Sequence, residues 1–195
     1  QPVGPTPTPL NDLKRAALWP GALLLLFLMI GLLPASDFGI GRYLPLHTAL
    51  EFVAMAISAM VFALGWNLRG TGKNSHAVIL GVGFLAVGLI DLAHTLSFAG
   101  MPDLVTPSSP EKAINFWLAG RFVAAAVLLT IALRPPTHWS QLRSLGALLA
   151  ALALSAGVWW LGIARSEWLP RTFIAGEGLT GFKIGAEYLL AALYG

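Results

Sequence analysis

Five long apolar segments dominate this sequence, and each is close to the length that a helix needs to cross a lipid bilayer. A span takes about 20 residues, because a helix rises about 1.5 Å per residue and the hydrocarbon core is about 30 Å thick. In lipid a single segment satisfies its own backbone hydrogen bonds only as a helix. The segments are residues 16–33, 46–66, 77–98, 116–133 and 145–164.

The composition supports lipid as the solvent of this chain. Charged residues make up 11% of the chain and hydrophobic residues 56%, whereas soluble domains are about 25% charged. A sixth apolar run starts at Ile184 and extends to Tyr194. We predict an all-α, polytopic transmembrane helix bundle over residues 14–195, with five full spans plus a truncated sixth. The Pro- and Thr-rich residues 1–13 are expected to be disordered.

The charge and cysteine content exclude several kinds of site and partner. The chain has no cysteine, which excludes disulfides and thiolate metal sites. Its net charge of +3 is attributed to the positive-inside bias of membrane proteins, and no nucleic-acid partner is expected. Residues 16–33 loosely resemble a signal peptide, but their length favours a retained anchor. Lysine and arginine in the loops, together with acids confined to the other side, indicate a multi-pass protein of the inner (plasma) membrane with a cytoplasmic N-terminus.

Ionisable residues inside the apolar runs are the main functional signal, because charge in lipid is costly and usually functional. Several of them share a helix face through spacings of three or four residues. At 1.5 Å per residue, each lies within about 10 Å of a run end, and alternating topology places all these ends at the outer leaflet. The predicted ligand or sensing residues are His47, Glu51, Asp91, His94, Trp117, Arg121, Lys183 and Glu187.

The chemistry of this polar layer leaves several alternatives open. Two imidazoles and two carboxylates, from His47, Glu51, Asp91 and His94, suit a transition metal such as Zn²⁺, Cu²⁺ or Fe²⁺. Two histidines on adjacent helices also suit haem. A small ligand, with Arg121 and Trp117 forming one wall of its site, is a further alternative. The structural alternative is mutual neutralisation, in which Arg121 pairs with Glu51 or Asp91.

Two other polar features are interpreted as structural. The histidines of the cytoplasmic loops, His76 and His138, are expected to be solvated. The segment 170–183 carries three glycines, which predict a turn over the outer mouth of the bundle, with a lid as the functional alternative. No GK[ST] sequence follows these glycines, so a phosphate loop is not indicated.

The order of four sequence blocks is similar to a known family. LPLHTALEFVAMAISAMVFALGWN, GLIDLAHTLSFAGMP, NFWLAGRFV and GEGLTGFKIGAEYL resemble the membrane-associated sensor domain of the third type, over about residues 44–187. That resemblance implies an N-terminal sensory input domain feeding a cytoplasmic histidine kinase or diguanylate cyclase. The eight predicted ligand or sensing residues match the family-like polar positions.

The sequence therefore predicts a sensory membrane domain that detects a ligand, metal or redox cue at its outer polar layer. The segment itself is not expected to be catalytic. The expected partners are the lipid bilayer, a covalently linked cytoplasmic signalling domain and, as an open alternative, a second copy of the chain. An intramembrane metal-dependent hydrolase, with Glu51 as general base, and a small-solute transporter are the rival functions.

Overall fold

The computed structural model describes Leu25, Met29 and residues 40–194. The chain divides into two compact units, Gln1–Gly41 and Arg42–Gly195, and the second unit holds nearly all of the described residues. The segment predicted to be disordered, residues 1–13, lies outside the described residues. The first predicted span, residues 16–33, also lies outside them, apart from Leu25 and Met29.

The described part of the chain is helical apart from one short β-hairpin, as the sequence predicted. Four helices are long and apolar enough to cross a membrane. The predicted count of five full spans and a partial sixth is not confirmed, because α6 has 14 residues and the first run is not described. The elements are α2 (Ile40–Asn67), η1 (Leu68–Gly70), α3 (Ser75–Leu96), α4 (Pro110–Leu133), α5 (Gln141–Ala164), η2 (Ser166–Trp168), β1 (Phe173–Ile174), β2 (Gly178–Leu179) and α6 (Gly181–Tyr194).

Capping residues set where two of these helices begin. The α4 helix starts six residues before the apolar run, since Ser109 accepts a hydrogen bond from the Lys112 backbone N–H and Pro110 occupies the first turn. Both features are typical of a helix N-terminus. Ser140 caps α5 in the same way. Apolar runs thus predict the membrane-embedded part of each helix, and capping residues add the polar turn outside it.

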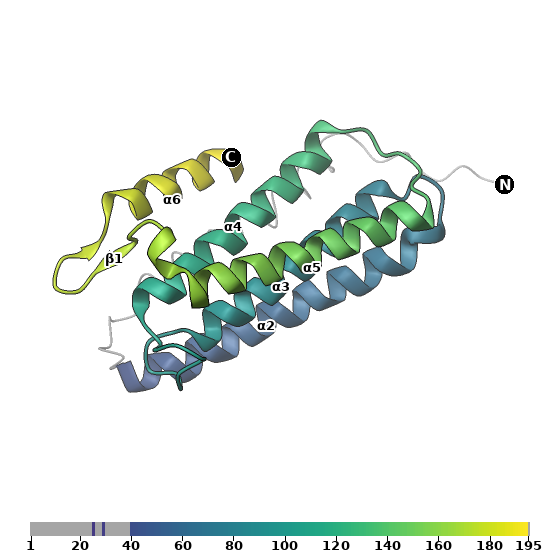
Figure 1. Ribbon diagram of the computed structural model, residues 1–195. Helices are drawn as coiled ribbons and strands as arrows, with labels where there is room; N and C mark the ends of the chain where they lie inside the picture. Colours follow the sequence, from purple (N-terminus) through teal and green to yellow (C-terminus); the bar gives the residue numbers. More distant parts are fainter. Residues whose placement is uncertain (1–24, 26–28, 30–39, 195) are drawn as a thin grey trace. The chain divides into compact units, whose positions relative to one another are not determined.

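The α3 helix is central in the bundle and packs against both α4 and α5 (Figure 1). Small and branched side chains along α3 are fully buried, whereas the other long helices keep apolar faces exposed. Phe116 of α4 is buried against Ile90 and Ala93 of α3. The core residues contributed by α3 are Val78, Val82, Ala86, Val87, Ile90 and Ala93.

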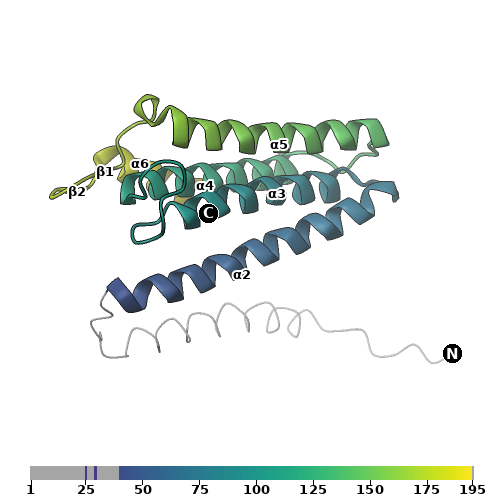
Figure 2. The same cartoon turned by 60° about the horizontal axis from the view of Figure 1, so that its bottom comes forward.

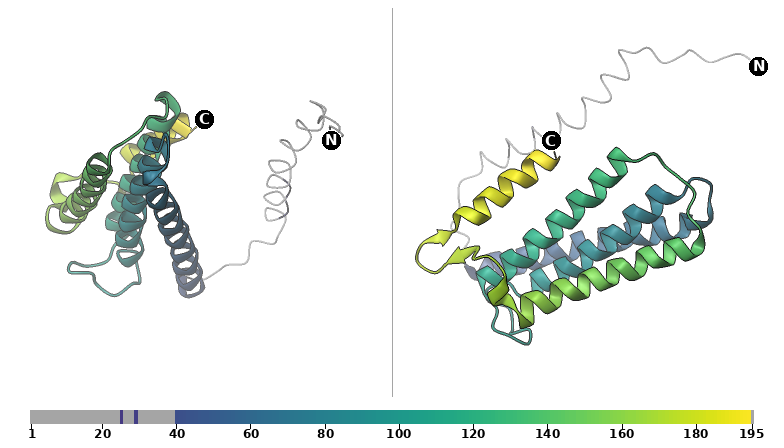
Figure 3. Two further views of the ribbon diagram at one scale, coloured as in Figure 1. Left: turned by 90° about the vertical axis from the view of Figure 1, so that its right-hand side faces the viewer. Right: turned by 45° about the horizontal axis from the view of Figure 1, so that its top comes forward.

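The α2 helix approaches α3 through glycine. A Cβ built on Gly65 would overlap the Ala77 carbonyl oxygen and lie 2.9 Å from the Cα of Gly81. Helices in lipid use such small residues to pack closely. Figures 2 and 3 show α2 meeting α3 near the turn that joins them and diverging from it toward the α2 N-terminus. Near the N-terminus of α2 the two backbones are therefore farther apart, and contact with α3 is made through side chains.

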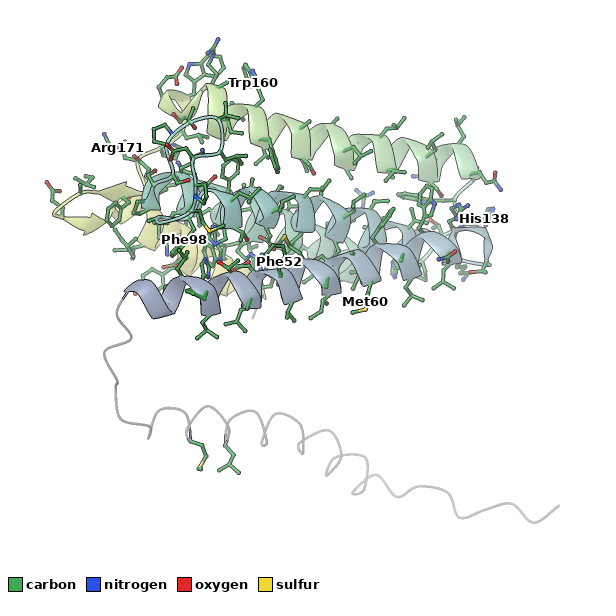
Figure 4. The ribbon with its side chains drawn as sticks, turned by 90° about the horizontal axis from the view of Figure 1, so that it is seen from below. Phe52, Met60, Phe98, His138, Trp160 and Arg171 are labelled. Carbon is green, nitrogen blue, oxygen red and sulfur yellow. The ribbon has the colours of Figure 1, made fainter. Side chains whose placement is uncertain are left out.

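The outward face of α2 is a continuous apolar surface. Figure 4 shows Met60, on this face, pointing away from the other helices. An exposed apolar face of this length suits contact with lipid. The exposed side chains, at alternating spacings of three and four residues, are Leu46, Leu50, Val53, Ile57, Met60 and Leu64.

The two ends of the bundle differ in their connections. At one end, which we call the short-turn end, residues 68–74 and 134–140 lie together, because Asn74 donates to the Trp139 carbonyl and accepts from the Trp139 N–H. At the other, the hairpin end, are the α3–α4 loop and the β1–β2 hairpin (Figure 1). Figure 4 shows Phe98 and Arg171 at the hairpin end and His138 at the short-turn end.

Candidate functional site

The hairpin end holds three potential metal-binding side chains from two helices. His47 and Glu51 lie one turn apart on α2, and His94 lies in the last turns of α3. Oε1 of Glu51 is 3.8 Å from Nδ1 of His47 and 3.8 Å from Nε2 of His94. One donor atom from each of the three residues lies within 4.8 Å of the others. We call these three residues the donor cluster.

A third helix orients one of the imidazoles. Nδ1 of His94 lies 2.8 Å from the backbone carbonyl oxygen of Ala113, in the first turns of α4. A carbonyl only accepts hydrogen bonds, so Nδ1 of His94 carries the proton and donates it. In the neutral ring Nε2 is then unprotonated, and it lies 3.8 Å from Oε1 of Glu51.

Aromatic rings surround the cluster. Tyr43 stacks on the His47 ring with centroids 5.6 Å apart and planes 8° apart. Phe98 lies 4.1 Å from the His47 ring centroid and 6.2 Å from that of His94. These rings exclude water from one side of the donors, which strengthens electrostatic interactions there.

The donor cluster is incompletely hydrogen-bonded, with His94 buried and His47 and Glu51 half-buried. The side chains of His47, Glu51 and His94 are 12%, 19% and 7% exposed. The His47 Nε2 atom is buried and has no hydrogen-bond partner among the described residues. A distance of 3.8 Å is longer than a hydrogen bond, so Glu51 does not bond to either imidazole. The three side chains meet without satisfying one another.

Asp91 and Arg121 form a second, separate group next to the donor cluster. Nη2 of Arg121 lies 2.7 Å from Oδ1 and 2.5 Å from Oδ2 of Asp91, which is buried. Gly120 leaves room for this carboxylate, because a Cβ there would lie 3.0 Å from Oδ1. The Tyr194 hydroxyl of α6 donates to the Arg121 carbonyl and connects α6 to α4.

A third group joins α6 to α4 in the first turns of α6, directly after the hairpin. Lys183 forms an ion pair with Glu187 one turn along α6. The Lys183 ammonium also lies 5.2 Å from the centroid of the Trp117 ring. Glu187 is 42% exposed, and ion pairs with such exposure contribute little to stability. This group fits a packing contact between the two helices.

The eight residues singled out in the sequence thus resolve into three groups. The structure brings His47, Glu51 and His94 together, whereas the Asp91 carboxylate is engaged by Arg121. Two aromatic neighbours, Tyr43 and Phe98, were missed. Each lies four residues along the chain from a cluster histidine, a spacing that could have identified them.

A cavity of about 420 Å³ lies beside the Asp91–Arg121 pair. Ser58 of α2 and Tyr194 of α6 are its other polar lining residues, and the remaining lining side chains are apolar. Pockets of this size and character bind small ligands. The lining of this cavity includes Arg121 but not Trp117, the two residues expected from the sequence to form one wall of a small-ligand site, and that alternative stays a prediction.

The predicted turn at residues 170–183 is a hairpin. Strands β1 and β2 pair antiparallel, with Phe173 opposite Leu179. Gly176 and Gly178 have φ of 87° and 94°, a region that glycine adopts without strain. The glycines are thus explained by the turn that they form.

Comparison with known protein families identifies the family of this chain. The model of one family, MASE3, a membrane-associated sensor domain, matches residues 38–195. This range contains every residue of the three groups and all the described helices from α3 onward. No curated protein and no solved structure matches the chain. With four candidate spans and a family match over most of its length, the chain belongs to the MASE3 family of membrane-associated sensor domains.

Proposed function

We propose that this domain is the sensory input of a signal-transduction protein and that its stimulus acts at the donor cluster. The stimulus is a ligand, a metal or a redox cue, and the output module is a linked cytoplasmic histidine kinase or diguanylate cyclase. Association of two copies belongs to the same proposal. The carrying observation is that His47, Glu51 and His94 converge from two helices without bonding to one another.

The incomplete bonding argues against a purely structural role for the cluster. Buried polar groups are normally hydrogen-bonded, and an exception calls for an explanation. The Asp91–Arg121 pair already fastens α3 to α4 with short hydrogen bonds. The donor cluster, with separations of 3.8 Å, adds little to that fastening. A site that gains its missing partners from a stimulus accounts for this arrangement.

The location of the cluster supports coupling to helix movement. Its donors come from α2 and α3, which pack tightly at Gly65 and Gly81 and diverge toward the hairpin end (Figure 2). A stimulus shifts an equilibrium only if it binds two arrangements with different free energies. A group that draws His47 and His94 together favours the arrangement in which α2 lies closer to α3.

We propose further that the protein lies in the inner membrane with its N-terminus and its short-turn end in the cytoplasm. The turns at this end carry Arg69, Lys73 and Arg134 and no acidic residue, as the positive-inside rule requires of cytoplasmic loops. Because the chain has no native cysteine, Lys73→Cys and Glu177→Cys can be labelled individually with an impermeant maleimide. Intact cells should label Glu177→Cys alone, and labelling of Lys73→Cys instead would reverse the orientation.

The test of the sensing proposal is output activity of the full-length protein in membranes. His94→Ala and Glu51→Gln should abolish regulated autophosphorylation or cyclic-dinucleotide synthesis without preventing insertion. The matched control is His76→Ala, since His76 lies at the short-turn end, half-buried and 2.8 Å from the Arg134 carbonyl oxygen. If both cluster variants keep the regulated output activity of the wild type, the cluster is not the site at which the stimulus acts.

A further inference from the structure

We propose that the donor cluster is a binding site for one divalent transition-metal ion, Zn²⁺, Cu²⁺ or Fe²⁺. Its protein ligands are His47, Glu51 and His94, and the remaining coordination positions are open to water or to an exogenous ligand. The role of this ion in signalling rests on the proposed function, whereas its binding does not.

The donor set selects this class of ion. Two imidazole nitrogens and a carboxylate oxygen are ligands of Zn²⁺, Cu²⁺ and Fe²⁺, and three protein ligands leave a position open in a tetrahedral site. Ca²⁺ and Mg²⁺ prefer oxygen ligands alone. The two imidazoles of His47 and His94 therefore favour a transition metal over these ions.

The separations of the donors suit a shared ion. Two ligand atoms about 2.0–2.1 Å from one ion, at the tetrahedral angle, lie about 3.3–3.4 Å apart. In the structure Oε1 of Glu51 lies 3.8 Å from a nitrogen of each imidazole. Glu51 must therefore approach each nitrogen by about 0.5 Å, and the two imidazole nitrogens, which lie within 4.8 Å of each other, must also draw together to share one ion.

The hydrogen bond from His94 to α4 prepares its other nitrogen for a metal. Metal-binding histidines usually donate their second ring N–H to a carbonyl or carboxylate, which fixes the tautomer and the orientation of the ring. Nδ1 of His94 donates to the Ala113 carbonyl at 2.8 Å. Nε2 is left as a free lone pair that faces Oε1 of Glu51.

His47 supplies the independent observation. Its Nε2 atom is buried without a hydrogen-bond partner among the described residues, and its Nδ1 atom lies too far from Glu51 to bond to it. An apolar surrounding makes such unsatisfied nitrogens costly. An ion bound through Nδ1, the nitrogen 3.8 Å from Glu51, gives the lone pair of this ring a partner, and the buried Nε2 then carries the proton.

The same geometry favours an ion over haem. The axial histidines of a haem lie on opposite faces of a porphyrin, which must fit between them. The His47 and His94 ring centroids are only 5.4 Å apart, at an angle of 78°, and the Glu51 carboxylate contacts both rings. The fourth residue considered from sequence, Asp91, has its carboxylate bound by Arg121 and is not included in the proposed set.

The test uses the full chain purified in nanodiscs and exposed to Zn²⁺ or Cu²⁺ alone. We expect one ion per wild-type chain after dialysis. Removing a residue that only hydrogen-bonds to a metal ligand weakens metal binding about 10–100-fold. His94→Ala and Glu51→Gln remove ligands themselves, so each should weaken binding by at least about 100-fold. The matched controls His76→Ala, in the first turn of α3 at the short-turn end, and Glu177→Gln, in the hairpin, should bind as the wild type does. Equal binding by all four variants would overturn the site.

A measurement on the wild type removes any dependence on variant folding. Electron paramagnetic resonance of the Cu²⁺-loaded chain should show coupling to two imidazole nitrogens, and coupling to none or one would contradict the ligand set. If the wild type binds no ion while the cluster variants lose output, the metal inference fails and the proposed function stands. If the ion binds through the cluster but the variants keep regulated output, the proposed function fails and the site stands.

Discussion

Two polar groups on neighbouring turns of α3 differ in how completely their side chains are satisfied. Asp91 receives two hydrogen bonds from Arg121, at 2.7 and 2.5 Å. His94, three residues later, donates one hydrogen bond from Nδ1 to the Ala113 carbonyl at 2.8 Å, and its Nε2 lies 3.8 Å from Glu51 without a hydrogen bond. Asp91 and His94 are 1% and 5% exposed, so burial does not explain the difference. The difference is explained by the side chains that each residue meets. The comparison distinguishes a structural ion pair from a group of potential metal ligands that are not hydrogen-bonded to one another.

The reach of the partner side chain is the physical origin of this contrast. Arginine presents several N–H donors on a long side chain and binds a carboxylate with two bonds. Arg121 therefore bridges from α4 to Asp91. The shorter His47 and Glu51 side chains come from α2 where it diverges from α3 (Figure 3), and they stop short of His94.

The largest effect on stability is expected from breaking the Asp91–Arg121 pair, in which the carboxylate is hydrogen-bonded although Nε of Arg121 has no partner among the described residues. Arg121→Met keeps most of the side-chain volume but leaves the buried Asp91 carboxylate without its charged partner. Breaking a buried ion pair in this way costs about 3–5 kcal/mol. Denaturant unfolding of the purified protein in detergent measures the loss. Adding Asp91→Asn to Arg121→Met should recover part of it, and a single variant as stable as the wild type would refute the structural role of the pair.

A smaller effect is expected where α2 is held to α3 without polar contacts. In Gly65→Ala the new methyl group overlaps the Ala77 carbonyl, and overpacking of this kind costs about 1–3 kcal/mol. The control is Gly157→Ala in α5, where nothing lies within 4 Å of the added Cβ and helix preference favours alanine by about 0.5–1 kcal/mol. Equal unfolding free energies for the two variants would show that the glycine contact does not hold α2.

The smallest effect on stability is expected at the donor cluster. Glu51→Gln removes a charge but no short hydrogen bond, because its nearest imidazole nitrogens are 3.8 Å away. A typical hydrogen bond contributes about 0.5–1.5 kcal/mol to stability. Because Glu51 makes no such bond, Glu51→Gln should change the unfolding free energy of the metal-free protein by less than about 1 kcal/mol. A loss as large as that of Arg121→Met, in the same unfolding measurement, would make the cluster a structural clamp.

The helices were predictable from the sequence to different degrees. The run at residues 77–98 came within two residues of α3, Ser75–Leu96, because apolar residues fill nearly the whole helix. The start of α4 was placed six residues late, since Pro110 and Glu111 of its first turn are not apolar. The hairpin at Phe173–Leu179 was predicted only as a glycine-rich turn.

The candidate site was predictable within helices but not between them. A spacing of four residues placed His47 and Glu51 on one face, and a spacing of three did the same for Asp91 and His94. The choice of partner across helices depends on distances that a sequence does not contain. Both Glu51 and Asp91 were open as partners of Arg121, and the position of Gly120 beside Asp91 decides this choice in the structure.

The most direct measurement is the change in unfolding free energy when metal-free protein is saturated with Zn²⁺. An ion that binds only the folded chain stabilises it by about 2.7 kcal/mol at 100 times its Kd. The wild type should show a stabilisation of this order, and Glu51→Gln should show none at the same Zn²⁺ concentration. The same stabilisation in both proteins would contradict the claim that the unsatisfied donors of α2 and α3 form the binding site.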